Sequence, residues 1–385
     1  MKIVYFSNYF NHHQKPFADA MNEVDGVEYT FVCTTKIPNF RKRLGYQELT
    51  AEYVLDATQS EENKKKALDL ALSADVAIFG GGKAIDYIAE RLKLKKITFN
   101  TSERRLKRGV VNALSPNFLK HLWIYFRYGK NSPYYMLCCS AYTANDYNLF
   151  KAFINKCYKW AYFTKVYEMN IDEILALKRQ EKCRIMWCSR FIGWKHPELC
   201  LDLAKRLRDD NLNFVIDMYG NGPLLEKYQK LVLENGLSKY INILGNRTND
   251  EILIAMQKHN IFLFTSDQNE GWGAVANEAM SNGCTLVGAD KIGAVPFLVK
   301  DGINGKIFKS KDGGSLYNAV RALVFNRDLC EKIAKEAYIN MRDIWSPENA
   351  ALRFITLVDN IKLGRMLTFE EGPCSQALPI NEKYS

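Results

Sequence analysis

The sequence predicts an α/β protein with two doubly wound domains, each built on a parallel sheet, and three observations support this fold class. Short apolar runs rich in β-branched and aromatic residues recur along the chain, as at Ile261–Phe264, and are typical of strands buried on both faces. Helix-length segments alternate with these runs, and polar, glycine-containing loops follow several of them. A chain of 385 residues, 47% of them hydrophobic, is long enough for about two domains with separate cores.

The first half of the chain contains the elements of one such domain. Strands are expected at 2–6, 29–33, 75–79, 96–99, 135–140 and 156–163, and helices at 16–24, 61–73, 84–92 and 141–150. The polar loop 7–14 follows the first strand, and its His12 and His13 fit a helix cap and a ligand-facing crevice equally well. The glycine-rich loop 80–83 lacks the spacing of a phosphate loop, so its main expected role is close packing, with lining of a crevice as the second.

The second half contains the elements of the other domain. Strands are expected at 184–188, 213–219, 241–244, 261–264 and 285–289, and helices at 197–208, 250–259, 274–282, 315–325, 328–340 and 349–363. The stretch 172–182 is charged and contains few apolar residues, so it is expected to be the linker. The final twenty or so residues, 365–385, are expected to form a poorly ordered tail.

Two carboxylates flank the loop–helix junction that follows the strand Ile261–Phe264. Glu270 lies in the loop, and Glu278 lies eight residues later, in the expected helix 274–282. Ligands of open parallel sheets bind at the carboxyl ends of the strands, and the N–H groups at the start of this helix would favour a phosphate. A carboxylate beside a diphosphate is unfavourable unless it has another role. We therefore expect Glu278 to bind hydroxyl groups, such as those of a ribose.

Two cations follow the strand 184–188 in another loop. Arg190 and Lys195 lie between this strand and the expected helix 197–208, where they can clamp a diphosphate and offset the charge that grows on a leaving group. The strand 213–219 also ends in a glycine-containing loop, Gly220-Asn221-Gly222-Pro223. The second sheet is therefore expected to bind a ligand that carries both phosphates and hydroxyls.

These residues together resemble the donor site of retaining GT-B glycosyltransferases of family 4 (glycosyl transferases group 1), of the bacterial surface-polysaccharide type. The motifs Glu270-Gly-Trp-Gly and Asn277-Glu278-Ala-Met-Ser-Asn-Gly and the spacing of Arg190 and Lys195 carry the resemblance, which is strong in the second half of the chain and loose in the first. It implies the GT-B fold, with two Rossmann-like domains facing each other across a cleft. The implied divisions are an acceptor domain at 1–168, a donor domain at 169–345, a helix at 346–364 that returns to the first domain, and a tail at 365–385.

The resemblance also implies an activity and a set of roles. A sugar is expected to pass from a nucleotide-sugar, by family habit a UDP-sugar, to an acceptor hydroxyl on a glycan or lipid-linked glycan, with retention of configuration. No metal or other cofactor is expected, because Arg190 and Lys195 supply positive charge and no suitable loop carries an Asp-x-Asp motif. Some related enzymes have histidine at the position of Glu103, so the role of this residue as acceptor base or hydroxyl ligand departs from that pattern. The implied residues are Glu270, Arg190, Lys195 and Glu103 for catalysis; Glu278, Gly271, Trp272, Gly273, Gly220 and Asn221 for the donor; and His12, His13, Asn11 and Ser102 on the acceptor side.

The charge and composition indicate the kind of partner and the compartment. A formal net charge of +10 favours anionic partners such as a nucleotide or a phospholipid surface, whereas no nucleic-acid-binding signature is found. Basic and aromatic residues are interleaved in 104–130, which fits either an interfacial helix on an anionic membrane or an ordinary core-facing helix. The ten scattered cysteines suggest a reducing compartment, and neither a signal peptide nor a membrane span is recognised. A cytoplasmic location is expected, with peripheral attachment to the inner face of the plasma membrane left open.

Two alternatives remain open at this point. The first is another GT-B enzyme, a sugar-nucleotide epimerase or a phosphorylase, and analysis of products formed from the donor alone would separate an epimerase from a transferase. The second is a catalytically silent GT-B subunit that binds or activates a partner transferase. Hydrolysis or transfer of a donor by the isolated chain would exclude this second alternative.

Overall fold

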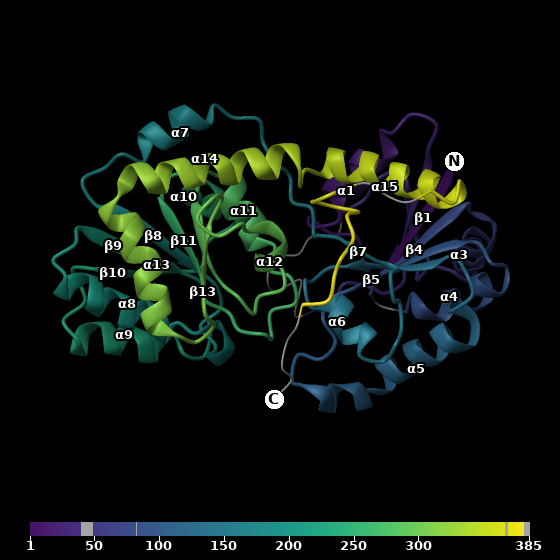
Figure 1. The fold of residues 1–385 in the computed structure, drawn as a ribbon, viewed down its shortest axis with the longest axis horizontal. Helices are drawn as coiled ribbons and strands as arrows, with labels where there is room; N and C mark the ends of the chain where they lie inside the picture. The colour runs from purple at the N-terminus through teal and green to yellow at the C-terminus, as the bar shows by residue number, and fades with distance from the viewer. Residues whose placement is uncertain (40–48, 82, 366–368, 381–385) are drawn as a thin grey trace. The chain divides into compact units, whose positions relative to one another are not determined.

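The computed structural model describes residues 1–39, 49–81, 83–365 and 369–380 of the chain. These residues belong to two compact units, one formed by Met1–Lys165 together with Ile344–Ser385, and the other by Val166–Asp343 (Figure 1). The chain therefore leaves the first unit once and returns to it, so its last long helix is part of the first unit.

The first unit is organised around a seven-stranded sheet in which all pairings are parallel. The strand order β3-β2-β1-β4-β5-β6-β7 places β1 next to β4, so the connections leave these two strands in opposite directions. Ligands of such sheets bind at the carboxyl ends of the strands beside this switch point. The strands are β1 Lys2–Ser7, β2 Glu28–Cys33, β3 Val54–Asp56, β4 Val76–Phe79, β5 Ile97–Ser102, β6 Tyr134–Cys138 and β7 Cys157–Lys159.

Helices cover both faces of this sheet, with α1 and α15 on one face and α3 and α4 on the other (Figure 1). Arg91 of α4 is fully buried and donates hydrogen bonds to the carbonyl oxygens of Ala71, Ala74 and Ile97, which fixes α3, α4 and β5 relative to one another. The helices are α1 Lys15–Asn22, α3 Glu61–Ser73, α4 Ile85–Lys93, the 3₁₀ helix η1 Val110–Leu114, α5 Pro116–Ile124, the π-helix η2 Tyr125–Gly129, α6 Thr143–Asn148 and α15 Pro347–Lys362.

The second unit repeats the same plan with six strands in the order β10-β9-β8-β11-β12-β13. All of its pairings are parallel, and β8 next to β11 is its switch point. Its central strands β11 and β12 are buried along their whole length, whereas the edge strands β10 and β13 are only partly buried. The strands are β8 Cys183–Cys188, β9 Phe214–Tyr219, β10 Ile241–Gly245, β11 Ile261–Phe264, β12 Thr285–Ala289 and β13 Lys306–Phe308.

The helices of the second unit lie on both faces of its sheet, with α11 and α14 on one face and α8 and α9 on the other (Figure 1). They are amphipathic: α8, for example, buries Leu199, Leu203 and Leu207 at the spacing of one helix face. The helices are α7 Ile171–Leu177, the 3₁₀ helix η3 Gly193–Lys195, α8 Glu198–Asp209, α9 Leu225–Glu234, α10 Asn249–Met256, α11 Val275–Ser281, α12 Val295–Leu298, α13 Gly313–Phe325 and α14 Arg327–Asp343.

The expected linker at 172–182 is wrong. Residues Ile171–Leu177 form helix α7, and its Ile171 and Leu175 are buried against Ala334 and Tyr338 of α14. In so short a helix, two apolar residues four positions apart make up the whole buried face. A pattern of two residues is too short to be recognised among the surrounding charged residues.

The poorly ordered tail expected at 365–385 is also wrong for the described residues 369–380. The backbone N–H of Lys159 in β7 donates to Ser375, and the N–H groups of Cys374 and Ala377 donate back to Lys159 and Cys157. Cys374 is fully buried. The segment therefore pairs along the edge of the first sheet, where it satisfies backbone groups that an open edge strand exposes.

Candidate active site

The carboxyl ends of β8 and β11 bring together three of the residues expected to carry the chemistry. Arg190 and Lys195 lie in the loop after β8, and Glu270 lies in the loop after β11. The two strands pair directly, with Ile185 opposite Ile261. Because both loops leave neighbouring strands at the switch point, they converge on the place where parallel sheets bind their ligands.

Lys195 and Glu270 form an ion pair inside this site. Their side chains are 12% and 15% exposed, and the same carboxylate oxygen of Glu270 accepts a hydrogen bond of 2.9 Å from the Ser266 hydroxyl. A partly buried pair of this kind is screened less by solvent than a surface pair. A phosphate that binds Lys195 would therefore compete with the carboxylate of Glu270.

One aromatic ring lies near both cations of the loop after β8. The Lys195 ammonium lies 4.4 Å from the centre of the Trp194 ring, and the Arg190 guanidinium lies 5.8 Å from the same centre. Arg190 is exposed, whereas Lys195 is partly buried. Both positive charges therefore lie within about 6 Å of one ring centre, close enough together to contact the same diphosphate.

The loop after β9 packs directly against the loop that carries Arg190. The N–H of Phe191 donates to the carbonyl of Asn221 at 2.9 Å, and the N–H of Ser189 donates to the carbonyl of Tyr219 at 3.0 Å. Gly220 has a φ of +128°, and a Cβ atom at this position would lie 1.9 Å from the carbonyl oxygen of Ser189. Only glycine fits this approach, so the placement of Arg190 depends on it.

Glu278 lies on α11, and burial raises the pKa of its carboxyl group from the ordinary value of 4.5 to about 7. Within the described part of the chain, its carboxylate has no hydrogen-bond or ion-pair partner. The indole of Trp272 is fully buried, and its N–H donates to the Asn277 side chain at 2.9 Å. This bond anchors the start of α11, so a ligand at Trp272 would meet the backbone and not the ring.

The raised pKa of Glu278 predicts a pH-dependent stability. Between its ordinary pKa of 4.5 and the raised value of about 7, the folded state keeps a proton that the unfolded state releases. The free energy of unfolding should therefore fall as the pH rises through this window, by about 1–3 kcal/mol, and then level off. In Glu278→Gln this fall should be absent. Urea denaturation across the window, with the exposed Glu226→Gln as the control, measures it; an equal fall in both variants would contradict the assignment.

Several residues of this site were not identified from the sequence. The Thr265 hydroxyl accepts a hydrogen bond of 2.9 Å from the Trp187 indole N–H and donates one of 2.6 Å to the Lys195 carbonyl, so it joins the two loops. Asp267 contacts His196 at 3.2 Å and the Lys311 ammonium at 3.2 Å. The available signal was position alone, because Thr265 to Asp267 follow β11 immediately at its carboxyl end.

The first unit contains a cavity of about 250 Å³ at the carboxyl ends of β1, β4 and β5. Amide and hydroxyl side chains from the loop after β1 line it, together with Glu103. We call it the aromatic cavity, because its lining includes Tyr5, Tyr9, Phe17, Trp160, Tyr162 and Phe163.

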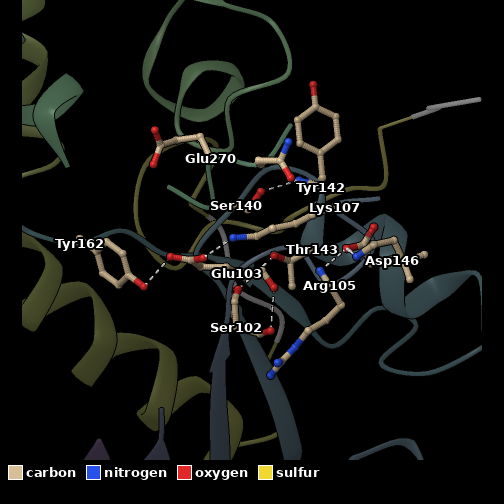
Figure 2. A network of polar contacts seen from close by, with 12 residues as sticks. Ser102, Glu103, Arg105, Lys107, Ser140, Tyr142, Thr143, Asp146, Tyr162 and Glu270 are labelled. Carbon is tan, nitrogen blue, oxygen red and sulfur yellow. Dashed lines mark hydrogen bonds and ion pairs between the residues drawn. The ribbon is translucent and has the colours of Figure 1, made fainter. Parts of the chain in front are cut away.

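Glu103 sits within a short row of polar contacts in this unit (Figure 2). Its carboxylate accepts a hydrogen bond of 2.8 Å from the Tyr162 hydroxyl and pairs with the Lys107 ammonium at 3.0 Å. Burial raises the pKa of Tyr162, so its hydroxyl stays protonated and keeps donating. These contacts hold the Glu103 carboxylate at the wall of the aromatic cavity.

The expected acceptor-side residues are distributed unequally. Asn11 and His13 line the aromatic cavity, and the side-chain oxygen of Asn11 accepts a hydrogen bond of 2.9 Å from the backbone N–H of His13. His12 is exposed and is not part of the lining, although its ring lies 4.0 Å from that of His13. Ser102 lines a neighbouring cavity instead.

Comparison with known proteins finds similarity in the second unit. Residues 173–340 match the family described as glycosyl transferases group 1. The chain is 31% identical over 140 residues to an uncharacterized glycosyltransferase of Methanocaldococcus jannaschii. This aligned stretch covers 36% of this chain and 38% of that protein. It is 28% identical over 123 residues to a poly(glycerol-phosphate) alpha-glucosyltransferase of Bacillus subtilis, which covers 32% of this chain and 18% of that protein.

Solved structures extend the similarity to the whole fold. The crystal structure of Anabaena HepE in complex with UDP superposes with a TM-score of 0.69 and 16% identity, over 94% of this chain and 100% of that chain. A second structure of the same protein, in complex with UDP-glucose, superposes with a TM-score of 0.63. The expected GT-B fold is therefore confirmed. In sequence, the chain spans less than two fifths of the length of the curated relatives that it matches.

Proposed function

Because residues 173–340 belong to the glycosyl transferases group 1 family, we propose that this protein transfers a sugar from a nucleotide-sugar to an acceptor hydroxyl, with retention of configuration. One observation carries the proposal: Arg190, Lys195 and Glu270 converge on the switch point of β8 and β11 in that family domain. UDP is the proposed nucleotide of the donor, since the solved HepE structures contain UDP and UDP-glucose. Assembly of a surface polysaccharide is the proposed setting.

The proposed roles follow from charge and position. Arg190 and Lys195 bind the diphosphate and stabilise the charge that develops on it as the sugar departs. Glu278 accepts hydrogen bonds from the ribose, and Glu270 binds hydroxyl groups of the reacting sugar. We propose that the reaction needs no metal, because the two cations supply the positive charge.

The aromatic cavity of the first unit is the proposed acceptor site. Flat aromatic rings pack against the apolar faces of sugar rings, while amide and hydroxyl groups such as those of Asn11 bind sugar hydroxyls. Glu103 is the proposed hydroxyl ligand or base on the acceptor side. A glycan acceptor fits this combination better than an apolar molecule does.

A screen of nucleotide-sugars by thermal shift, followed by product analysis, tests the proposed function. A bound donor raises the melting temperature according to the logarithm of its concentration over its Kd. Hydrolysis of a UDP-sugar by the isolated chain, with release of a sugar of unchanged anomeric configuration, would support a retaining transferase. Conversion of the donor alone into an epimeric nucleotide-sugar would favour an epimerase, and a lack of both reactions would favour a silent subunit.

The segment from Lys107 to Lys130 is the proposed membrane-facing surface of the first unit. Large apolar side chains are exposed there, among them Val111 at 75%, Leu114 at 73% and Trp123 at 58%. Exposed cations on the same segment complement an anionic lipid surface. No described helix is both long and apolar enough to span a bilayer. We propose peripheral attachment to the inner leaflet of the plasma membrane, with the exposed cations Arg108, Lys120, Arg127 and Lys130 facing the lipid.

This proposal predicts how the protein binds vesicles. Replacing the four cations by glutamine should abolish most binding to anionic vesicles, since each contributes about 1 kcal/mol near such a surface. Trp123→Ser should weaken the binding that persists at high salt, because that remnant comes from apolar burial. Cosedimentation measures both, and donor hydrolysis should stay unchanged. Equal binding to neutral and anionic vesicles at low salt would contradict the proposal.

Arg104 is excluded from this set of cations. It is buried, and its guanidinium lies 4.5 Å from the centre of the Tyr142 ring. A cation held inside the unit in this way contributes little to attraction by a membrane surface.

A further inference from the structure

A second cavity, of about 510 Å³, lies beside the aromatic cavity in the first unit. The two cavities share Gly81, Thr101, Glu103 and Tyr162 as lining residues, so they meet along a common wall. The second cavity differs in its chemistry. Its lining includes three cations, Arg104, Arg105 and Lys107, and we call it the basic cavity.

The charge balance of the basic cavity is positive. Three cations line it against one lining carboxylate, that of Glu103. A further carboxylate, that of the fully buried Asp146, lies beneath the loop and accepts the backbone N–H groups of Arg105 and Leu106. Three positive charges against two negative charges leave a surplus of one. Arg105 lines this cavity, and the Tyr147 side chain, to which its guanidinium is hydrogen-bonded, holds that cation in place.

The histidine in this cavity does not change the balance. His121 is buried, and its two ring nitrogens each lie 2.9 Å from a tyrosine hydroxyl, those of Tyr147 and Tyr134. Burial, helped by the nearby Arg105, lowers the pKa of His121 to about 3. The imidazole is therefore neutral at working pH and offers polarity without charge.

Gly81 lines both cavities, and the space beside it is open. Its φ is not positive, and the nearest atom to a Cβ placed there is the side-chain amide of Asn8 at 3.7 Å, an ordinary contact. The fold would therefore accept alanine at this position. The neighbouring Gly80 is different, because a Cβ there would lie 3.0 Å from the Thr101 hydroxyl and 3.3 Å from the Phe6 carbonyl. Packing therefore explains Gly80, whereas a larger side chain at Gly81 would extend into the space that the two cavities share.

We propose that the acceptor of this enzyme is an anionic sugar, whose ring lies in the aromatic cavity and whose phosphate group lies in the basic cavity. The inference rests on the proposed function and specifies its substrate class. Arg105 and Lys107 bind the phosphate by charge-assisted hydrogen bonds, and the chain of the ligand passes Gly81 and Glu103. When the phosphate binds Lys107, Glu103 is released from its ion pair and gains freedom to contact the acceptor hydroxyl.

Calorimetric titration with glucose 1-phosphate and with glucose, in the presence of saturating UDP, tests the proposal. UDP occupies the cations of the second unit, so the remaining difference between the two probes reports on the first unit. Glucose 1-phosphate should bind at least about tenfold more tightly than glucose at low ionic strength. The double variant Arg105→Gln, Lys107→Gln should remove this difference between the two probes.

Arg108→Gln is the matched control, because it removes the same charge from the same loop outside the basic cavity. It should keep the preference for glucose 1-phosphate. Gly81→Leu adds bulk without changing charge and should weaken binding of the phosphate probe about tenfold or more. Equal affinities for the two probes in the wild type, or a preference that survives the double variant, would overturn the proposal.

Vesicles identify the source of the phosphate. Phosphatidylcholine vesicles that carry a small fraction of a polyprenyl phosphate are compared with vesicles that carry the same fraction of phosphatidylglycerol. Tighter binding to the polyprenyl phosphate, lost in Arg105→Gln, would assign the phosphate to a lipid-linked acceptor; equal binding would assign it to a soluble sugar phosphate. A chain that binds no UDP would contradict the proposed function. The comparison of glucose 1-phosphate with glucose, in the wild type and in the double variant, would still report on the basic cavity.

Discussion

Lys195→Ala and Arg190→Ala are each expected to lower kcat/KM for sugar transfer by about 10²–10³-fold, which corresponds to roughly 2.7–4 kcal/mol of transition-state stabilisation. Each cation gains strength as negative charge grows on the departing diphosphate, so the loss should appear mainly in kcat. Steady-state kinetics with a UDP-sugar would measure the effect.

The two substitutions should differ in how they depend on Glu270. Lys195 pairs with Glu270, whereas Arg190 is exposed and has the Trp194 ring beside it. Removing Lys195 leaves the Glu270 carboxylate unpaired in a partly buried site, which adds repulsion toward a bound diphosphate. Lys195→Ala should therefore raise the donor KM more than Arg190→Ala does.

Lys239→Ala is the control for these two variants, because Lys239 is an exposed lysine of the same unit outside the site. It should keep the activity and melting temperature of the wild type. If Arg190→Ala and Lys195→Ala also keep the wild-type kcat/KM while remaining folded, the clamp does not exist.

Much of this fold follows from the sequence because its strands are locally unambiguous. Ile261–Phe264 and Thr285–Ala289 are short, apolar and rich in β-branched or aromatic residues, and both form strands with the expected bounds. The loops after such strands must lie at one edge of a parallel sheet. For this reason Arg190, Lys195 and Glu270 could be assigned to one site without knowledge of the sheet order.

Other features depend on packing between segments that are distant in the chain, and no local pattern encodes them. Strands β3 and β13 contain only three residues each and gain their stability from the neighbouring strands β2 and β12. Trp160 and Tyr162 line the aromatic cavity although nothing in their own segment indicates a ligand site. The ion pair between Lys195 and Glu270 likewise links residues 75 positions apart.

The last prediction separates the two glutamates of the donor site. Glu270→Ala should lower kcat by about 10²-fold or more, because the proposed contact with the reacting sugar strengthens in the transition state. The same change frees Lys195 from its ion pair, so this lysine becomes more available to the donor diphosphate. The donor KM of Glu270→Ala should therefore stay constant or fall.

Glu278→Ala should show the opposite signature. Contacts to the ribose change little between the ground state and the transition state, so their loss should raise the donor KM about tenfold and leave kcat nearly unchanged. Because burial raises the pKa of Glu278 to about 7, the wild-type donor KM should also fall as the pH rises through that value, since the carboxylate accepts hydroxyl hydrogen bonds better than the acid does. Glu278→Gln should lose this pH dependence, whereas Glu270→Gln should keep it. Identical kinetic signatures for Glu270→Ala and Glu278→Ala would show that the two carboxylates act as one unit, and the assignment of one to the sugar and the other to the ribose would then be wrong.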